Sequence, residues 1–283
     1  MLFRSTLAIA RKFSRTRFFD WIAESRATVV AGNPTVINML NTAPVDFDRA
    51  RVPWLRFMTS SSAPLLVQDW KSFEERYGIP IVQGYGSSET GWIAASSETA
   101  RKLGSVGRPL AYHRLATVDA DGCALPAGEI GLVELGAAEG SLFCYLGDDG
   151  APLAHARGRY RTGDLGYLDA DGYLFLTGRE KDLIIRGGVN ISPVEIDNVL
   201  NQMAEIAEAA CVGVPDAIYG EEVVAVVVVR PGITLAEDSV VAHCRARLAA
   251  PKVPKRVLFR DSLPKTERGK LDRKALAADT RPS

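Results

Sequence analysis

The chain has 283 residues, of which 47% are hydrophobic and 24% charged, and its 34 basic side chains balance 34 acidic ones. These proportions are typical of an ordinary soluble globular protein. A net charge of zero gives no electrostatic sign of nucleic-acid binding, and no apolar run is long enough to span a bilayer. The longest run, residues 223–229, is expected to be a buried strand.

The first part of the chain alternates helices with short apolar strands. This alternation predicts an α/β fold with a mostly parallel sheet covered by helices on both faces. Pro34 is well placed to open one helix after a turn at Gly32 and Asn33. The expected elements are a helix over residues 17–26, a strand over 27–31, a helix over 35–40, a strand over 55–59, a helix over 65–77 and a strand over 80–83.

The pattern changes between residues 105 and 176, where Asp-Gly pairs stand at 121–122, 149–150 and 171–172. Such pairs are typical of hairpin turns, so we expect a small antiparallel β-subdomain with strands over residues 114–118, 131–135 and 173–176. A compact α+β unit should follow, with helices over 193–203 and 236–249 and strands over 209–214, 223–229 and 256–259. We place a domain boundary near Lys181, which gives domains of residues 1–180 and 181–283.

Polar motifs follow these elements in a fixed order. They are Tyr85-Gly86-Ser87-Ser88-Glu89-Thr90, Tyr160-Arg161-Thr162-Gly163-Asp164-Leu165-Gly166, Gly178-Arg179-Glu180-Lys181-Asp182 and Arg186-Gly187-Gly188-Val189-Asn190. The chain then reaches a loop punctuated by Pro264 and Gly269, in which Lys270 follows the glycine. A glycine lets the backbone pass close to a ligand, and an ammonium on a long stem suits phosphate.

In this order and spacing, the motifs resemble those of the acyl-adenylate-forming superfamily. That superfamily groups acyl-CoA synthetases, the adenylation domains of peptide synthetases and beetle luciferases. The resemblance implies that a carboxylic acid attacks the α-phosphorus of ATP, that pyrophosphate leaves, and that the acyl-AMP then reacts with CoA. Such a reaction brings two anions together, so it needs cations, a metal ion and rigid positioning.

The resemblance also implies roles for individual residues in nucleotide binding. Lys270 would bridge the attacking carboxylate and the α-phosphate, and Asp164 would bind the ribose hydroxyls with support from Arg179. Tyr85, next to Gly86, would stack on adenine, and Ser88 would donate a hydrogen bond to the α-phosphate. Glu89 would hold Mg²⁺, and Ser62, within the serine-rich segment 60–64, would line the adenine and acyl pockets. Taken singly, these residues have simpler explanations, such as a surface lysine for Lys270 and a turn residue for Asp164.

The same resemblance assigns a second set of residues to CoA. Lys181 would be a hinge about which the small domain turns between the two half-reactions. Gly187 and Gly188 would let the slender pantetheine arm of CoA pass closely. Asn190 would contact CoA or cap a turn.

One expected motif is missing from the sequence. The superfamily has a Ser/Thr/Gly-rich phosphate loop with a lysine ahead of the tyrosine motif, and residues 1–84 contain nothing similar. We therefore expect the chain to begin inside the large domain, with exposed edges at strands near residues 6–10 and 29–31. A complementary polypeptide or another copy of the chain would then be its partner.

Three functions stay open at this point. The first is an acyl-CoA synthetase-type ligase, favoured over a peptide-synthetase module because the few residues after Lys274 leave no room for a carrier domain. The second is a non-catalytic fragment or half of a split enzyme. The third is an enzyme of the thioester half-reaction alone, which takes acyl-AMP ready-made. The sequence does not identify the carboxylic acid.

The cysteines and the N-terminal residues bear on the cellular compartment of the protein. Cys123, Cys144, Cys211 and Cys244 form no CxxC pair and have no histidine at metal-ligand spacing, so we expect inert thiols in a reduced, cytoplasmic protein. Five basic residues precede the first acid, Asp20, a composition also found in mitochondrial transit peptides. We favour ordinary folded protein, because residues 13–21 match an internal strand-to-helix step of the superfamily.

Overall fold

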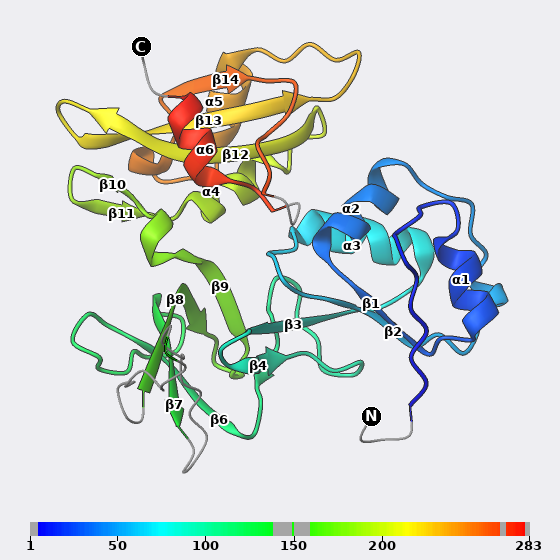
Figure 1. Cartoon of the computed structure of the whole chain (residues 1–283). Helices are drawn as coiled ribbons and strands as arrows, with labels where there is room; N and C mark the ends of the chain where they lie inside the picture. Colours follow the sequence, from blue (N-terminus) through cyan, green and yellow to red (C-terminus); the bar gives the residue numbers. More distant parts are fainter. Residues whose placement is uncertain (1–4, 138–148, 150–158, 267–269, 281–283) are drawn as a thin grey trace. The chain divides into compact units, whose positions relative to one another are not determined.

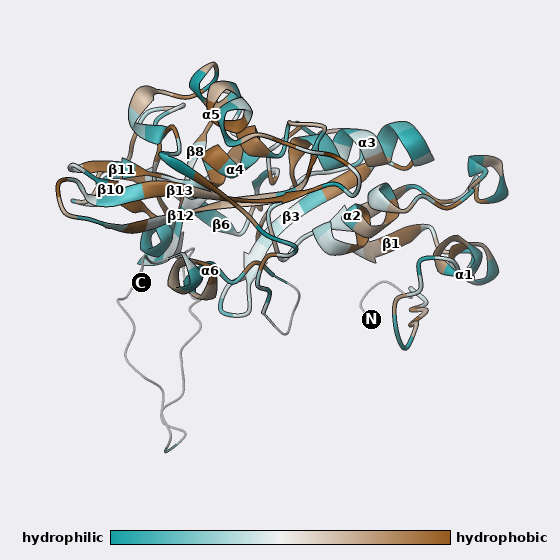
Figure 2. Ribbon diagram, turned by 90° about the horizontal axis from the view of Figure 1, so that it is seen from above, coloured by the Kyte–Doolittle hydropathy of each residue, from teal (hydrophilic) through white to brown (hydrophobic). Residues whose placement is uncertain are grey.

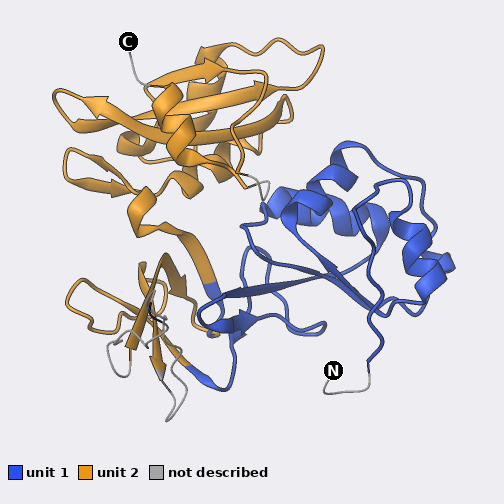
Figure 3. Cartoon of the chain, viewed as in Figure 1, with its two compact units in different colours: residues 1–113, 143–154, 172–174 blue, residues 114–142, 155–171, 175–283 orange. Residues whose placement is uncertain are grey.

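The computed structural model describes residues 5–137, 149, 159–266 and 270–280 (Figure 1). The chain divides into two compact units, drawn in different colours in Figure 3. The first comprises residues 1–113, 143–154 and 172–174, and the second comprises residues 114–142, 155–171 and 175–283. Each unit has its own hydrophobic core. The domain boundary expected near Lys181 stays a prediction, because compactness does not by itself locate a boundary between domains.

The first unit is built on a five-stranded sheet of order β1-β2-β3-β4-β5. The pairs β1–β2 and β2–β3 are parallel, as the sequence predicts, whereas β3–β4 and β4–β5 are antiparallel. The elements are α1 Phe18–Ser25, β1 Val29–Gly32, α2 Pro34–Thr42, the short 3₁₀ helix η1 Arg49–Arg51, β2 Phe57–Ser60, α3 Val67–Tyr77, β3 Ile81–Ser87, β4 Gly91–Ala95 and β5 Arg108–Pro109.

Helix ends in this unit follow from local chemistry. Asn33 caps α2 by accepting a hydrogen bond from Val36 N at 2.9 Å, and Pro34 opens the helix as expected. Helix α3 ends at Gly78, whose φ of 61° is left-handed and suits glycine. Its buried face carries Trp70 and Phe73, which fill the core beside α2.

The expected strand near residues 6–10 is wrong. Residues 5–10 form no strand, and the side chains of Leu7 and Ile9 are 67% and 80% exposed. An alternating segment stays a strand only when a neighbour accepts its backbone hydrogen bonds, and no pairing of these residues occurs in the described part of the chain. The expected edge at β1 is present, because β1 ends the order of the sheet.

Most of a small sheet of order β6-β7-β8-β9 lies in the second unit, and its β7–β8 pair is antiparallel. Its strands are β6 His113–Val118, β7 Gly131–Ala137, β8 Arg159–Leu168 and β9 Leu174–Arg179. Gly122 and Gly172 have φ values of 85° and 77°, which places glycine at a left-handed position in two of the predicted Asp-Gly turns. The third turn, at 149–150, includes Gly150, which lies outside the described residues.

The rest of this unit is the expected α+β arrangement. Its sheet has the order β11-β10-β13-β12, and β14 pairs in parallel with β13. The elements are the 3₁₀ helix η2 Glu180–Asp182, β10 Ile184–Arg186, β11 Val189–Ile191, α4 Pro193–Leu200, β12 Ile206–Asp216, β13 Gly220–Val229, α5 Glu237–Arg245, the 3₁₀ helix η3 Ala250–Lys252, β14 Arg256–Phe259 and α6 Arg273–Asp279.

Both faces of the β12–β13 pair are buried, which explains its apolar composition in Figure 2. Alternate residues such as Cys211 and Ala225 face the core formed with α4 and α5. Their neighbours, such as Val212 and Val226, face a second cluster that includes Leu276 of α6. The prediction that residues 223–229 form a buried strand is confirmed. No helix among the described residues has the length and apolarity needed to cross a bilayer.

Candidate functional site

The tyrosine motif forms the β3–β4 hairpin of the first unit. Tyr85 lies opposite Ala94, and the register shifts at the next residue, Gly86. A Cβ on Gly86 would meet the carbonyl oxygen of Gly91 at 2.1 Å, so glycine is required where the two strands approach. Ser88 is exposed at the tip, and Glu89 is half-buried beside it. The hairpin therefore carries a phenol, a hydroxyl and a carboxylate within residues 85–89.

Ser62 lies at the same edge of the sheet as this hairpin. Strands β2 and β3 are parallel neighbours with Ser60 opposite Gln83, and Ser62 and Tyr85 each follow that pair by two residues. The φ of Ser62 is 75°, an unusual left-handed value for a residue other than glycine. Strained backbone at the carboxyl edge of a parallel sheet is a common feature of ligand sites. The pocket-lining role expected for this segment stays a prediction.

The aspartate motif forms a bulge within β8. The register between β7 and β8 shifts after Leu132, so that residues 162–164 stand opposite Val133. Thr162 holds the bulge, because its hydroxyl donates to Val133 O at 3.0 Å and accepts from Asp164 N at 3.1 Å. Gly163 has a φ of 73°. Bulges redirect a side chain out of the regular pleat, and this one sets the direction of Asp164.

The bulge brings together two of the predicted nucleotide residues. Asp164 has a side chain that is 11% exposed, and its Oδ1 lies 2.8 Å from Nε of Arg179 at the end of β9. Arg179 remains 54% exposed, so its guanidinium can also reach a ligand. This ion pair places both residues at one point of the second unit, and their expected role in ribose binding stays a prediction.

The predicted hinge and CoA residues lie farther along this unit. Lys181 is exposed and is the middle residue of η2, which follows Arg179. Gly187 and Gly188 form the two-residue turn between β10 and β11, with φ values of 56° and 82°. A turn with two positive φ values selects glycine for backbone reasons, independently of any ligand. Asn190 does not cap a turn, because it pairs with Ile185 within β11 and is exposed.

Lys270 lies in the second unit, where two nearby segments of the chain pair with each other. Lys265 and Leu271 form an antiparallel bridge, and Thr266 N donates to Lys270 O at 2.8 Å. In return, Lys270 N donates to the hydroxyl of Thr266 at 3.2 Å. Lys270 is exposed. Its backbone is thus fixed by hydrogen bonds, whereas Gly269 lies outside the described residues.

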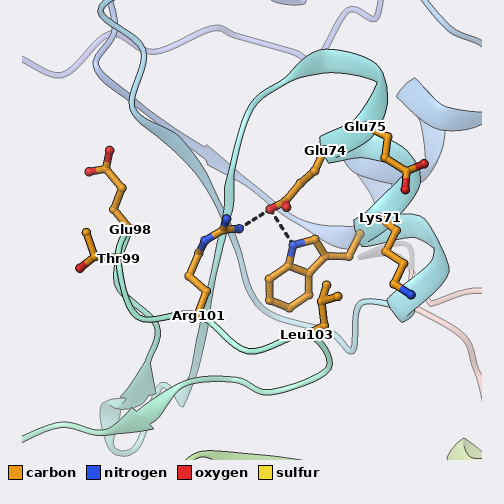
Figure 4. Close-up of a pocket in the computed structure, with 8 residues that line it drawn as sticks. Lys71, Glu74, Glu75, Glu98, Thr99, Arg101 and Leu103 are labelled. Atoms are coloured by element: carbon orange, nitrogen blue, oxygen red, sulfur yellow. Dashed lines mark hydrogen bonds and ion pairs between the residues drawn. The ribbon is translucent and has the colours of Figure 1, made fainter.

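A pocket of about 410 Å³ lies elsewhere in the first unit and contains none of the predicted site residues (Figure 4). Its lining consists of Trp70, Lys71, Glu74, Glu75, Glu98, Thr99, Arg101 and Leu103. The carboxylate of Glu74 accepts hydrogen bonds from Trp70 Nε1 at 2.7 Å and Ile81 N at 2.6 Å, and it pairs with Arg101. These bonds connect α3 to β3, and we interpret the pocket as structural.

Titratable groups outside the motifs offer no competing site. Within the described residues, no group of three or more His, Cys, Asp or Glu side chains could hold a metal ion. Burial raises the pKa of Cys244 to about 11 and raises the pKa of Cys211 well above its ordinary value. The raised pKa disfavours the reactive thiolate at these two buried cysteines, whereas Cys123 is exposed and Cys144 lies outside the described residues.

The predicted site residues fall into two groups. Ser62, Tyr85, Gly86, Ser88 and Glu89 lie in the first unit, and Asp164, Arg179, Lys181, Gly187, Gly188, Asn190 and Lys270 lie in the second. The roles expected of the individual residues stay predictions. That both groups act on one nucleotide stays a prediction. The sequence reasoning did not single out Thr162, although its place in a Thr-Gly-Asp tripeptide was the available signal.

Comparisons with known proteins match these motifs to a family. A model described as "AMP-binding enzyme" matches residues 1–138, and one described as "AMP-binding enzyme C-terminal domain" matches residues 195–270. The chain is 36% identical over 279 residues to an oxalate–CoA ligase of Arabidopsis thaliana, covering 96% of this chain and 54% of the relative. It is 37% identical over 272 residues to a sulfoacetate–CoA ligase of Cupriavidus necator, covering 95% and 53%.

A solved structure agrees with the sequence relatives. ATP-bound MatB from Rhodopseudomonas palustris matches with a TM-score of 0.84 and 32% identity, over 96% of this chain and 54% of that one. The chain therefore spans about half the length of the relatives that it matches. Because two family models cover most of the chain and their motifs fold as described, the chain belongs to the AMP-binding enzyme family, and its relatives are of the acyl-CoA synthetase type.

Proposed function

We propose that this chain is part of an acyl-CoA synthetase-type ligase. Such a ligase activates a carboxylic acid with ATP as acyl-AMP and transfers the acyl group to CoA. The observation that carries the proposal is the Asp164–Arg179 pair on its bulge. A carboxylate held in one direction suits two neighbouring ribose hydroxyls, and the adjacent guanidinium limits its rotation. Names of the relatives, which include oxalate and sulfoacetate ligases, support small acids as the first substrates to try.

The adenylation step is assigned to side chains of both units. In this proposal Lys270 donates to the attacking carboxylate and the α-phosphate, which offsets the negative charge that develops as pyrophosphate leaves. Ser88 donates its hydroxyl to the same phosphate. Tyr85 stacks on adenine, and Gly86 keeps the hairpin narrow beside it, with Ser62 lining the adjacent pocket.

Mg²⁺ would neutralise phosphate charge during this step. Glu89 fits such a role because it is half-buried and follows Ser88 directly in the sequence, and Mg²⁺ prefers carboxylate and phosphate oxygens. Mg²⁺ commonly uses one or two protein carboxylates together with substrate phosphates and water. A dense protein cluster of metal ligands is therefore not needed.

The thioester step is assigned to the β10–β11 hairpin. Lys181 lies between β9 and β10, where a change in backbone angles would move this hairpin as one body. Gly187 and Gly188 present backbone without side chains at the turn, and Asn190 adds an exposed amide next to it. Such a surface suits a thin pantetheine arm. The domain boundary at Lys181 and the cytoplasmic location stay predictions.

The edge strand β1 favours a second candidate function. Val29 on this edge is 40% exposed, and β1 pairs with β2 on one side in the described part of the chain. Such an edge accepts another strand readily. In this alternative the chain is a non-catalytic unit or one half of a split enzyme, and a complementary polypeptide or a second copy covers β1.

Two half-reaction assays distinguish these candidates. Pyrophosphate exchange into ATP is measured with a panel of small mono- and dicarboxylic acids, and thioester formation is measured from synthetic acyl-AMP and CoA. Exchange with any acid supports the complete ligase, and thioester without exchange supports the second half-reaction alone. Absence of both, together with no binding of a non-hydrolysable acyl-adenylate analogue, would overturn the proposed function for this chain.

A further inference from the structure

Helix α6 is anchored by a buried ion pair with α4. Arg273, its first residue, pairs with the carboxylate of Asp197, and the two side chains are 18% and 10% exposed. Arg273 Nη1 also donates to Cys211 O at 2.7 Å, and Asp197 Oδ1 accepts from Cys211 N at 2.7 Å. The ion pair therefore binds both the backbone N–H and the backbone C=O of Cys211 in β12.

The position of Cys211 explains why the pair is there. Strand β12 lies at the end of the sheet order, with β13 as its neighbour, and Cys211 stands opposite Ala225. In antiparallel sheets, alternate residues direct their N–H and C=O groups away from the neighbouring strand. The groups of Cys211 point to the outer edge, where Asp197 and Arg273 bind them. The pair thus joins α4, β12 and α6 at a sheet edge.

The Asp197–Arg273 ion pair lies at the C-terminal end of the segment that carries Lys270. We define the strap as residues 263–266 and 270–272. Leu263 is 4% exposed and packs into the cluster that also contains Leu276 of α6. Asp272 N donates to Pro264 O at 2.9 Å, and the side chain of Asp272 caps α6 by accepting from Ala275 N at 3.0 Å. The strap is therefore held at both ends.

We propose that Arg273 is a positioning residue for Lys270, because its ion pair with Asp197 and its bond to Cys211 fix the end of the strap three residues away. The inference rests on the proposed adenylation role of Lys270. An arginine is needed because its planar fork reaches two acceptors, Cys211 O and the Asp197 carboxylate, at once. A lysine keeps the charge beside Asp197 and loses this geometry.

Arg273→Lys is therefore the informative variant, and Lys274→Gln, at the exposed next position of α6, is its matched control. Hydrogen exchange is followed at the amides of Lys270 and Asp272, and at Val224 and Val226 in the buried strand β13 as a reference for global stability. We expect exchange at the strap to rise about tenfold in Arg273→Lys and to stay unchanged in Lys274→Gln. Exchange at β13 should stay within about twofold.

Asp197→Asn checks the other partner and should raise strap exchange in the same way. Unchanged strap exchange in both variants, or an equal rise at the strap and at β13, would overturn the anchoring. Where the chain is active, Arg273→Lys should slow pyrophosphate exchange about tenfold and leave thioester formation from acyl-AMP within about twofold. Equal loss of both steps would overturn the positioning role. If the wild-type chain performs neither step, the proposed function fails, and the exchange data still decide whether Arg273 fixes the strap.

Discussion

Arg179 Nε lies 2.8 Å from Asp164 Oδ1, although the two residues come from different strands of the small sheet. The ion pair limits the rotation of the carboxylate and so holds it in one direction. A side chain held in this way loses less entropy on binding than a free one. Nucleotide binding should therefore depend on both residues.

Replacing Asp164 by alanine should weaken the binding of an acyl-adenylate analogue. A charged hydrogen bond contributes about 1.5–3 kcal/mol, so we expect a loss of roughly 10- to 100-fold in affinity. Calorimetric titration measures it. Asp121→Asn, at an exposed turn of the same unit, is the control and should bind normally. Normal binding by Asp164→Ala would remove this residue from the site.

Lys270→Ala should slow adenylation severely and spare the thioester step. Loss of one preorganised donor typically costs about 3–4 kcal/mol of transition-state stabilisation, which is roughly a 10²- to 10³-fold slower step. Because Lys270 is exposed, the melting temperature should not change. Lys274→Ala serves as the neighbouring control. An equal decrease in pyrophosphate exchange and in thioester formation from acyl-AMP would contradict the assigned role.

Substitutions at Gly188 distinguish a role of this glycine in the stability of the turn from a role in CoA binding. A Cβ at this position meets open space, but its φ of 82° strains an alanine by about 1–2 kcal/mol. Asparagine tolerates left-handed backbone, so Gly188→Asn should unfold in urea close to the wild type, and Gly188→Ala should unfold earlier. If pantetheine passes here, Gly188→Asn should still slow thioester formation. A normal thioester rate in Gly188→Asn would leave the glycine with a role in the turn alone.

Asp216 should make stability fall in acid. Hydrogen bonds from Tyr219 N and Ile218 N, with a smaller contribution from Lys255, lower the pKa of Asp216 below its ordinary value of 3.8. A carboxyl with a lowered folded-state pKa stabilises the fold above its unfolded pKa, and the contribution disappears as pH decreases through the folded value. Between about pH 5 and pH 2, the unfolding free energy of the wild type should therefore decrease more than that of Asp216→Asn. Urea unfolding at several pH values measures this decrease. An equal decrease in the wild type and in Asp216→Asn would contradict the assignment.

Thiol labelling should follow burial. Cys123 is exposed, whereas burial raises the pKa of Cys244 to about 11 and also raises that of Cys211. The thiolate is the reactive form, so at pH 8 iodoacetamide should modify Cys123 well before the two buried thiols. Peptide mapping by mass spectrometry resolves each site. Early labelling of Cys211 would show that the edge of β12 opens in solution.

The sequence predicts elements well where one local signal is strong. Residues 256–259 form β14 as expected, and Pro34 opens α2. Strand β8 was not predicted, because the bulge at Thr162 and Gly163 breaks the alternation that identifies strands. The short helix α6 was also missed, since its stability comes from tertiary contacts such as Leu276 in the core.

The candidate site shows the same division. Each motif could be located from sequence, because its glycines and polar residues have fixed spacing. The contact between Asp164 and Arg179 depends on the register of separate strands, and that between Asp197 and Arg273 joins residues 76 positions apart. Pairings of this kind depend on packing of whole elements, which a single sequence does not reveal.

Strand β3 belongs both to the parallel part of the sheet and to the β3–β4 hairpin. Its first residues pair with β2 in the parallel sheet and lie over the core at Ile81, while its last residues carry Tyr85 into the hairpin. Temperature-sensitive alleles of this protein should therefore include substitutions at Ile79 or Ile81, which would misplace the tyrosine on warming without touching a ligand. The activity of such variants should be lost on warming, as after a substitution in the active site, and should return on cooling.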